Sequence, residues 1–455
     1  MSRRGFLAAT ATVLGAGLAA ACDSEGGTQG GTTAPAGIKP ILIVGAGMAG
    51  LGAARSLRDA GWPVKVIEAR DRIGGRVFTS RDWGVPLDMG ASWIHGTTDN
   101  PLTEVAKKAG IETFPTDYVG GHATIDPLVQ PNEYNDEIED GWRKFVERAA
   151  DDADGGTLAA AVDTATDRDD LSAAERLQLA LFVNTEIAQE FAADADQLSA
   201  TNYDEGDYTT GAQVILPSGY DNLARALAEG LDIVTNTAVT NVVQRGDSVS
   251  VSAGNRSFDG SAAIVTVSLG VLKSGAIAFD PPLPDRHAQA VEALGFGVLS
   301  KSYFRFEQRT WKSEGDFHQF MGTDPTMWAQ WFTLPAQIGP IVLAFNAGKQ
   351  GRAVESASPD QLMTTAVPIA RQIFGEDLKP VEVKTSNWSL DPYALGSYSF
   401  QAPGSSFEDR ARLQDPISDR LYLAGEAVGT DNPATAHGAL LSGRHAADEL
   451  MRRLG

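Results

Sequence analysis

The sequence predicts an α/β protein of two domains, and three observations support this prediction. A strand–turn–helix–strand order occupies residues 41–68, strand patterns return at residues 233–269, and another strand is expected at residues 421–424. A helical block and a β-rich block separate these pieces. Strands joined through a helix favour a parallel sheet. We therefore expect a Rossmann-like domain assembled from separate parts of the chain, with a mixed-sheet and helical domain inserted into it.

The first strand and the first helix are joined by a glycine-rich turn. Residues 41–44 have the composition of a short buried strand, and Gly45-Ala46-Gly47-Met48-Ala49-Gly50 leads into a helix expected over residues 51–60. Gly45 permits a tight turn, Gly47 lets backbone N–H groups approach a pyrophosphate, and Gly50 lets the helix pack close to the strand. The N-terminus of the helix then faces the phosphate charge.

Two features after this helix indicate which dinucleotide binds. Glu68 follows the second strand, 18 residues past Gly50, where a carboxylate can accept hydrogen bonds from both ribose hydroxyls of an adenosine and would repel a 2′-phosphate. Residues 69–76 add a second glycine pair and Arg76, which can hold the pyrophosphate from its other side. This favours FAD over NAD. The alternative for the glycine-rich turn is that it only packs the helix on the strand. The alternative for residues 69–76 is an ordinary basic loop.

The rest of the chain alternates helical and strand patterns in blocks. Strands are expected at residues 85–88, 233–234, 238–243, 249–251, 262–269, 301–306 and within 327–345, and helices within 140–200, near 361–374 and after Pro433. These patterns suggest a cofactor domain made of residues 39–115, 212–294 and 386–455. The second domain would then consist of residues 116–211 and 295–385. A signal at residues 1–22 and a flexible linker at 23–38 would precede both domains.

The N-terminal segment is typical of an export signal. Arg3 and Arg4 precede an apolar, Ala-rich run that ends at Ala21, and the paired arginines resemble a twin-arginine signal. Cys22, the single cysteine of the chain, follows Leu18-Ala19-Ala20-Ala21, which resembles a bacterial lipoprotein cleavage site. We expect an extracytoplasmic lipoprotein anchored at the cell surface or in the periplasm. The alternative is soluble secretion with an incidental Cys22. Either way, one cysteine allows no disulfide within the chain.

The charge balance is strongly acidic. The chain holds 37 basic and 59 acidic side chains, a net charge of −22, and removal of residues 1–22 would leave 35 basic side chains and a net charge of −24. Nucleic acid and anionic lipid surfaces are therefore poor partners. No apolar run of 18 residues occurs after the N-terminal segment, so we expect no membrane-spanning helix there.

Five motifs in order make the chain resemble the flavin-dependent amine oxidases of the monoamine oxidase and polyamine oxidase group, over roughly residues 40–452. The motifs are residues 43–50, 68–76, 88–96, 266–273 and 421–426. Residues 433–443 are similar to those of spermine oxidases and lysine-specific histone demethylases. Residues 90–96 read Gly-Ala-Ser-Trp-Ile-His-Gly and are followed by Asn-Pro-Leu at 100–102. Of these two groups, this run favours the polyamine oxidases over the histone demethylases.

The resemblance implies a set of residues that contact FAD. They are Gly45, Gly47, Ala49, Gly50, Glu68, Ala69, Arg70, Gly75, Arg76, Gly90, Ala91, Ser92, Trp93, Val239, Trp388, Gly425, Glu426, His437, Gly438 and Ala439. It also implies that Lys301 is the catalytic lysine, linked through a water molecule to the reactive ring nitrogen of the flavin. Burial among apolar residues would lower the pKa of such a lysine. The alternative is a surface lysine at the start of a strand.

Two departures from the family pattern concern the substrate end. Ser397 stands where monoamine oxidases carry a cysteine bonded to the flavin, so FAD is expected to be held without a covalent bond. Tyr398 matches one wall of the aromatic cage around the substrate amine, whereas the opposite position is Thr435. One aromatic face and a hydroxyl suit a long, slender amine. The residues expected to contact its distal nitrogens are His95, Glu190, Glu205 and Asp207, unless these acids are only solvated surface groups.

The resemblance implies oxidation of a polyamine C–N bond in spermine, spermidine or their acetylated forms. Hydride would pass to the flavin, the imine would be hydrolysed to an aldehyde and an amine, and dioxygen would reoxidise the cofactor to give hydrogen peroxide. No metal is expected. One rival is an oxidase of L-amino acids or of other amines, which for an amino acid needs a positive group such as Arg305 or Arg371 near the substrate carboxylate. A second rival is a lipoprotein that carries FAD without amine chemistry.

Overall fold

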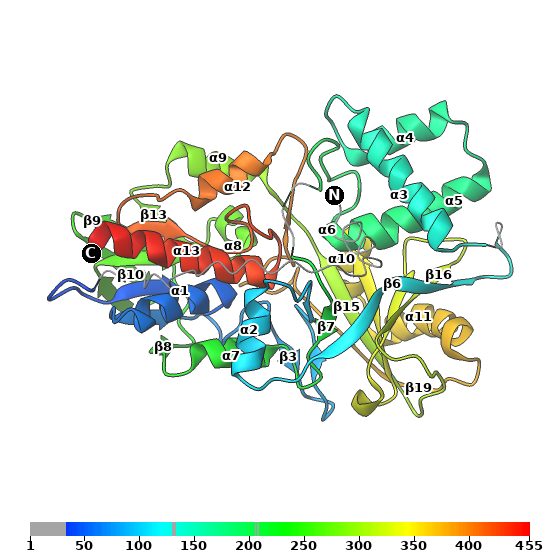
Figure 1. Ribbon diagram of the computed structural model, residues 1–455, viewed down its shortest axis with the longest axis horizontal. Coiled ribbons are helices and arrows are strands. Elements are labelled where there is room, and N and C mark those ends of the chain that lie inside the picture. The colour runs from blue at the N-terminus through cyan, green and yellow to red at the C-terminus, as the bar shows by residue number, and fades with distance from the viewer. Residues whose placement is uncertain (1–32, 130–132, 205, 207–208) are drawn as a thin grey trace, which may run out of the picture.

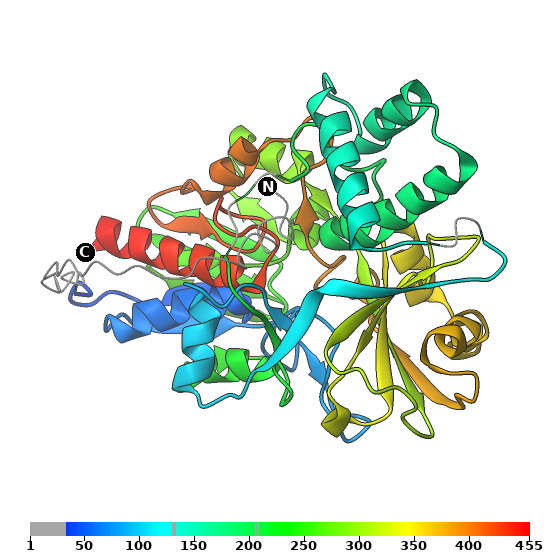
Figure 2. The ribbon, with the colours of Figure 1, turned by 45° about the vertical axis from the view of Figure 1, so that its right-hand side comes forward.

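The computed structural model describes residues 33–129, 133–204, 206 and 209–455. It confirms the mixed α/β fold class. One part of the molecule, on the left of Figure 1, holds helices α1 (Met48–Asp59) and α13 (Ala436–Leu454). The other part, on the right, holds strand β15 (Leu299–Phe306) and helix α11 (Pro359–Phe374). Figure 2 shows the same two parts side by side after a turn of 45°.

The part on the left is built on a five-stranded parallel sheet. Its strands run in the order β21 (Leu421–Leu423), β12 (Ala262–Val265), β1 (Ile41–Val44), β2 (Val64–Ile67) and β8 (Ile233–Val234). Both β1 and β12 are buried along their whole length, as expected for central strands of a parallel sheet. Segments from the beginning, middle and end of the chain therefore meet in one sheet.

Helices α1 and α13 pack closely against each other, and Figure 1 shows them side by side. A Cβ atom on Gly443 would lie 2.0 Å from the carbonyl oxygen of Ala49, so only glycine fits at this contact. Leu51, Leu57, Leu440 and Leu450 fill the core beside it. This packing brings the N-terminal ends of both helices to the same region of the molecule.

The part on the right is built on an eight-stranded sheet. Its strands run in the order β19 (Pro380–Thr385), β15, β18 (Ile341–Ala347), β17 (Gln330–Thr333), β16 (Asp316–Met321), β6 (Phe114–Ile125), β7 (Gln213–Ile215) and β5 (Trp93–Ile94). All neighbouring strands are antiparallel except β16 and β6. One face holds an aromatic cluster around Phe317, Phe332 and Phe345, and α11 packs on the other face.

Helices cover the upper right of Figure 1, in the segment where the sequence predicts a helical insertion. They are α3 (Asp136–Asp151), α4 (Leu158–Arg168), α5 (Ala173–Phe182) and α6 (Gln189–Phe191). A π-helical turn, Val183–Ala188, joins α5 to α6. Such turns are rare and often lie at functional sites.

Smaller elements complete the structure. A four-stranded sheet has the order β11 (Arg256–Gly260), β10 (Ser248–Ala253), β9 (Asn241–Arg245) and β13 (Ala278–Asp280), and the pairs β3–β4 (Thr79–Ser80, Leu87–Asp88) and β14–β20 (Gly295–Phe296, Ser399–Phe400) stand apart. The remaining helices are α2 (Pro101–Lys108), α7 (Asp221–Ala228), α8 (Leu269–Lys273), α9 (Asp285–Ala293), α10 (Gly348–Ser356) and α12 (Phe407–Gln414). Within the described ranges, no helix has both the length and the apolar character needed to cross a membrane.

Several predicted boundaries were wrong, among them the following three. The first helix begins at Met48 and not at residue 51, because residues directly after Gly47 already have helical conformation. The strand expected at 262–269 ends at Val265, because the Ser268 side chain accepts a hydrogen bond from Val271 N and caps α8. The strand expected at 238–243 runs instead from Asn241 to Arg245.

Candidate active site

One cavity of about 510 Å³ is lined by residues of both large sheets. Its walls include Glu68 and Gly425 from the ends of parallel strands and Lys301, Gln330 and Phe345 from the eight-stranded sheet. Ligands of α/β proteins bind at the carboxyl ends of parallel strands. The cavity therefore extends from the expected nucleotide site to the expected catalytic lysine.

The glycine-rich turn has the geometry that its sequence predicts. Gly45 has a φ of +105°, which L side chains rarely adopt. A Cβ atom on Gly50 would lie 2.0 Å from the carbonyl oxygen of Gly45, so α1 packs directly against the turn. At Gly47 a Cβ atom would meet no atom within 4 Å, and this residue lines the cavity. The start of the 12-residue helix α1 thus leaves room for a pyrophosphate.

Glu68 is buried beside this turn, with 3% of its surface exposed. Its Oε2 accepts a hydrogen bond of 2.6 Å from Ala46 N, and its Oε1 accepts one of 2.9 Å from Arg70 N. Each carboxylate oxygen can accept a further hydrogen bond. The Glu68 carboxylate is therefore fixed in place and can still accept hydrogen bonds from two ribose hydroxyls.

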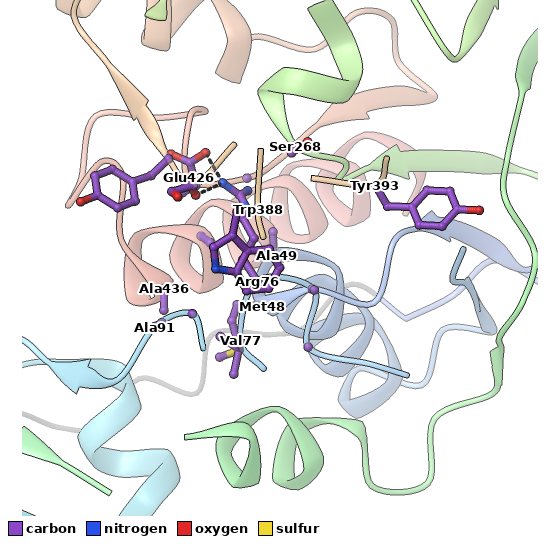
Figure 3. Close-up of a pocket in the computed structure, with 18 of the residues that line it drawn as sticks. Met48, Ala49, Arg76, Val77, Ala91, Ser268, Trp388, Tyr393, Glu426 and Ala436 are labelled. Carbon is purple, nitrogen blue, oxygen red and sulfur yellow. Dashed lines mark hydrogen bonds and ion pairs between the residues drawn. The ribbon is translucent and has the colours of Figure 1, made fainter. Parts of the chain in front are cut away.

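Arg76 and Glu426 form an ion pair across the cavity wall. The distance from Arg76 Nη1 to Glu426 Oε1 is 2.9 Å, and dashed lines mark the contact in Figure 3. Burial alone would raise the pKa of Glu426, but the charge of Arg76 and a hydrogen bond from Ser399 Oγ outweigh it and hold that pKa below its usual value. This ion pair links the 69–76 segment to the segment that follows β21.

Lys301 lies in an apolar corner at the other end of the cavity. It is 5% exposed, and its Nζ donates hydrogen bonds to the carbonyl oxygen of Gly90, at 2.5 Å, and to Ser92 Oγ. The same Nζ lies 5.2 Å from the centroid of the Trp93 ring. Burial lowers the pKa of Lys301 to about 7, although the Asp88 carboxylate acts in the opposite direction. Lys301 is therefore not a surface lysine.

The 88–93 segment that receives Lys301 is fixed from several sides. Trp388 Nε1 donates a hydrogen bond of 2.8 Å to the carbonyl oxygen of Met89, and Tyr303 Oη donates one of 2.8 Å to that of Asp88. A Cβ atom on Gly90 would lie 1.7 Å from the carbonyl oxygen of Arg76. The 88–93 segment therefore packs directly on the 69–76 segment. Its position relative to Lys301 and to the nucleotide site is set by these contacts.

The substrate-side candidates meet in the same cavity. The Tyr398 hydroxyl donates a hydrogen bond of 2.7 Å to the carbonyl oxygen of Gln189, and His95 Nδ1 lies 2.9 Å from Gln213 Oε1. The Thr435 hydroxyl donates to Asn432 O at 2.7 Å and accepts from Gly438 N at 2.9 Å, so it caps α13 as well as lining the cavity. Glu190 also lines the cavity. Glu205 and Asp207 lie outside the described residues.

The comparisons with known proteins agree with this geometry. Residues 48–451 match the family model described as flavin containing amine oxidoreductase. The chain is 30% identical to Polyamine oxidase 4 of Oryza sativa subsp. japonica, with 91% of this chain and 89% of that protein covered. It is 31% identical to Polyamine oxidase 2 of Arabidopsis thaliana, with coverages of 91% and 88%. The chain belongs to the flavin-containing amine oxidoreductase family.

The fold of this amine oxidase is also similar to that of a solved structure, putrescine oxidase bound to putrescine. The TM-score is 0.72 at 21% identity, with 91% of this chain and 99% of the other covered. FAD is the cofactor of this amine oxidase, and the open space at Gly47 and the fixed carboxylate of Glu68 fit its pyrophosphate and ribose. No thioether to the flavin can form at Ser397, whose hydroxyl bonds Leu299 N at 2.9 Å.

Of the predicted site residues that the structure describes, all but two line the cavity. The exceptions are Gly50, which packs on Gly45, and Gly438, where a Cβ atom would lie 1.9 Å from Asn432 O. The two arginines considered for an amino-acid carboxylate do not line it: Arg305 pairs with Glu382 at 2.7 Å, and Arg371 bonds Leu378 O at 3.0 Å.

Several cavity residues were not predicted from the sequence. They are Thr185 and Gln189 from the π-helical turn and its C-terminal end, and Phe317, Gln330 and Phe345 from the eight-stranded sheet. No local motif marks them, because their positions depend on which strands are neighbours. An alternating strand pattern places a residue on one face of a sheet, but it does not say which residue lies opposite.

Proposed function

We propose that this amine oxidase acts on polyamines and oxidises a C–N bond of spermine, spermidine or an acetylated form. The observation that supports this most is the charge of the cavity beyond Lys301. The described arginines that line the cavity are Arg70 and Arg76, and both are paired at the cofactor end, with Asp391 and Glu426. The substrate end holds Glu190 instead, which suits a cationic amine. The names of the relatives point in the same direction.

FAD, when bound, accepts a hydride from the carbon beside an amine nitrogen and passes the electrons to dioxygen, which yields hydrogen peroxide. The chain's own residues hold the groups around that reaction. Tyr398 and Thr435 line the cavity on its substrate side, and Trp388 fixes the 88–93 segment. The imine released from the amine is then hydrolysed by water to an aldehyde and a shorter amine.

Lys301 is proposed to hold and release a proton at Nζ. Its pKa is lowered by burial to about 7, so both protonation states are populated near neutral pH. Hydrogen bonds to Gly90 O and Ser92 Oγ orient the Nζ atom. A proton can thus pass between this amine and a water molecule in the cavity when the substrate or dioxygen reacts.

The rival functions make different predictions for one experiment. An L-amino-acid oxidase would need a cation for the substrate carboxylate, and neither Arg305 nor Arg371 lines the cavity. A lipoprotein that only carries FAD would need no buried lysine. Release of hydrogen peroxide from the purified holoenzyme upon addition of spermine, but not of L-amino acids, supports the proposal, and peroxide from amino acids alone would contradict it.

We also propose export of the folded protein through its twin-arginine-type N-terminus, followed by lipid anchoring at Cys22. The support is in the sequence, since residues 1–32 lie outside the described residues. Twin-arginine export carries folded proteins, which suits a chain that must bind FAD before it leaves the cytoplasm.

A further inference from the structure

A second, smaller cavity borders the 88–93 segment. Its volume is about 30 Å³, and Asp88, Ser92 and Tyr303 contribute polar side chains to its lining, whereas most of the other lining side chains are apolar. A water molecule needs a cavity of at least about 10–15 Å³ and about two to four polar partners. The small cavity therefore has the room and the polar partners for about two water molecules.

Ser92 lines both the large and the small cavity. Its Oγ accepts the hydrogen bond from Lys301 Nζ. Its own hydroxyl hydrogen is offered to the carbonyl oxygens of Asp88 and Gly90 at 3.3 Å each, which is longer than the about 2.7–2.8 Å typical of a hydroxyl donor. The Ser92 hydroxyl is thus weakly held and can turn toward water in the small cavity.

The Asp88 carboxylate is anchored through one of its two oxygens. Thr79 Oγ1 donates a hydrogen bond of 2.6 Å to Asp88 Oδ1, and Tyr220 N donates one of 2.9 Å to the same atom. Among the described residues, these are the two hydrogen-bond donors to this carboxylate, and Asp88 lines the small cavity. Oδ2 is therefore the oxygen that can take a proton from water in that cavity.

The titratable groups that contact or act on Asp88 come from several elements, and they are the Lys301 amine, the Asp221 carboxylate, the Arg81 guanidinium and the phenols of Tyr220 and Tyr303. Arg81 and Asp221 form an ion pair at 2.8 Å, so their charges largely cancel at Asp88. Burial raises the pKa of both tyrosines, which therefore stay protonated near neutral pH. Lys301 is thus the neighbour whose charge changes there.

Burial also brings the pKa values of Asp88 and Lys301 close together. It raises the pKa of Asp88 to about 6 and lowers the pKa of Lys301 to about 7. A difference of about one unit means that a proton prefers Lys301 over Asp88 by only about tenfold. Proton transfer between the two side chains is therefore close to balanced.

We propose that Asp88 is a positioning residue for the amine oxidation, which exchanges one proton with Lys301 through the Ser92 hydroxyl and water in the small cavity. Nζ gives a proton to Ser92 Oγ, the Ser92 hydroxyl gives its own proton to water, and water gives one to Asp88 Oδ2. The ammonium becomes a neutral amine, the carboxylate becomes a carboxylic acid, and no electrons move. The neutral Nζ can then accept a proton from the large cavity as the substrate amine reacts. This inference rests on the proposed function, because it adds a residue to the same reaction.

Two substitutions test this relay through the kcat–pH profile of spermine oxidation by the holoenzyme. Asp88→Asn keeps an oxygen that can accept both present hydrogen bonds, but its amide cannot take the proton. Its kcat should fall about tenfold. The inflection near pH 7 should move to lower pH, because the Asp88 charge raises the pKa of Lys301. Ser92→Ala keeps the carboxylate but breaks the path, so its kcat should fall about as far, and the double variant should lose no more. Asp259→Asn, the same change at an exposed strand position, should match the wild type.

A merely structural role for Asp88 would give a different pattern. Asp88→Asn would then lower kcat without moving the inflection, or leave the profile unchanged, and either result would overturn the proposal. Wild-type kcat in Ser92→Ala would also overturn it, because the path would not use this hydroxyl. FAD content is measured for each variant, since Ser92 also lines the large cavity. If a variant does not retain FAD, an infrared measurement on the wild type decides.

That measurement follows the proton on the carboxylate directly. A carboxylic acid has an infrared C=O band that a carboxylate lacks, and this band shifts in deuterated water. Anaerobic reduction of the holoenzyme by spermine should produce such a band as the flavin absorbance bleaches, in the wild type and Asp259→Asn but not in Asp88→Asn. Bleaching without the band in the wild type would overturn the relay and leave a polyamine oxidase. No bleaching with any polyamine would overturn the proposed function and the relay with it.

Discussion

Lys301 of β15 donates a hydrogen bond of 2.5 Å to the carbonyl oxygen of Gly90, and this contact ties the eight-stranded sheet to the 88–93 segment at the end of the cavity away from the nucleotide site. Gly90 itself packs on the Arg76 main chain of the nucleotide side. The lysine proposed to be catalytic is therefore held at a fixed place relative to the FAD site. Its burial beside Trp93 also explains why its pKa falls to about 7.

Replacement of Lys301 by Met should slow turnover without loss of FAD. Met retains most of the bulk of the side chain and lacks the amine, so the cavity wall should keep its packing. We expect kcat to fall at least about tenfold, which corresponds to about 1.4 kcal/mol of barrier. Steady-state kinetics together with the FAD content of the purified variant check this. Unchanged turnover would remove Lys301 from the mechanism.

The turnover rate, kcat, should depend on pH because the Lys301 amine changes its protonation state near neutral pH. Because its pKa is lowered to about 7, the neutral amine predominates above that pH and the ammonium below it. A step in which Nζ accepts a proton should therefore slow as pH falls through about 7. The kcat–pH profile of the wild type should show this inflection, and that of Lys301→Met should not. The same inflection in both proteins would assign the titration to another group.

Glu68→Ala should weaken FAD binding. The change removes hydrogen bonds to both ribose hydroxyls, and bonds to a charged group contribute about 1.5–3 kcal/mol each. It also leaves the N–H groups of Ala46 and Arg70 without their present acceptor. Equilibrium titration of the apoprotein should give a dissociation constant at least about tenfold higher. Glu229→Ala, at an exposed position, is the control. Equal affinities in all three proteins would exclude Glu68 from the site.

The nucleotide half of the site could be predicted because its determinants are local. Gly45, Gly50 and Glu68 belong to one βαβ unit, and the spacing along the chain fixes their positions in space. The substrate half depends on pairing between distant strands. The position of Gln330 opposite Phe345 follows from the register of β17 and β18, which no local pattern specifies. Strand β6 was also missed, since its sequence holds two adjacent glycines and no apolar alternation.

The export proposal can be tested in the native host. Replacement of Arg3 and Arg4 by lysines should leave FAD-loaded, active protein in the cytoplasm, because the paired arginines form the signal. Cys22→Ala should release exported protein from the membrane fraction. Cell fractionation with activity staining measures both. Wild-type protein that is already soluble outside the cell would contradict the lipid anchor and leave the export signal standing.

The most direct test of the proposed polyamine oxidation is the stoichiometry of amine oxidation by the purified holoenzyme. Spermine, spermidine and N1-acetylspermine should each be tested for peroxide release, oxygen uptake and formation of an aldehyde, beside short monoamines and L-amino acids. We predict one hydrogen peroxide and one aldehyde for each polyamine molecule that is cleaved once, with polyamines well ahead of the other classes. Peroxide from monoamines or amino acids, with none from any polyamine, would contradict the proposed function.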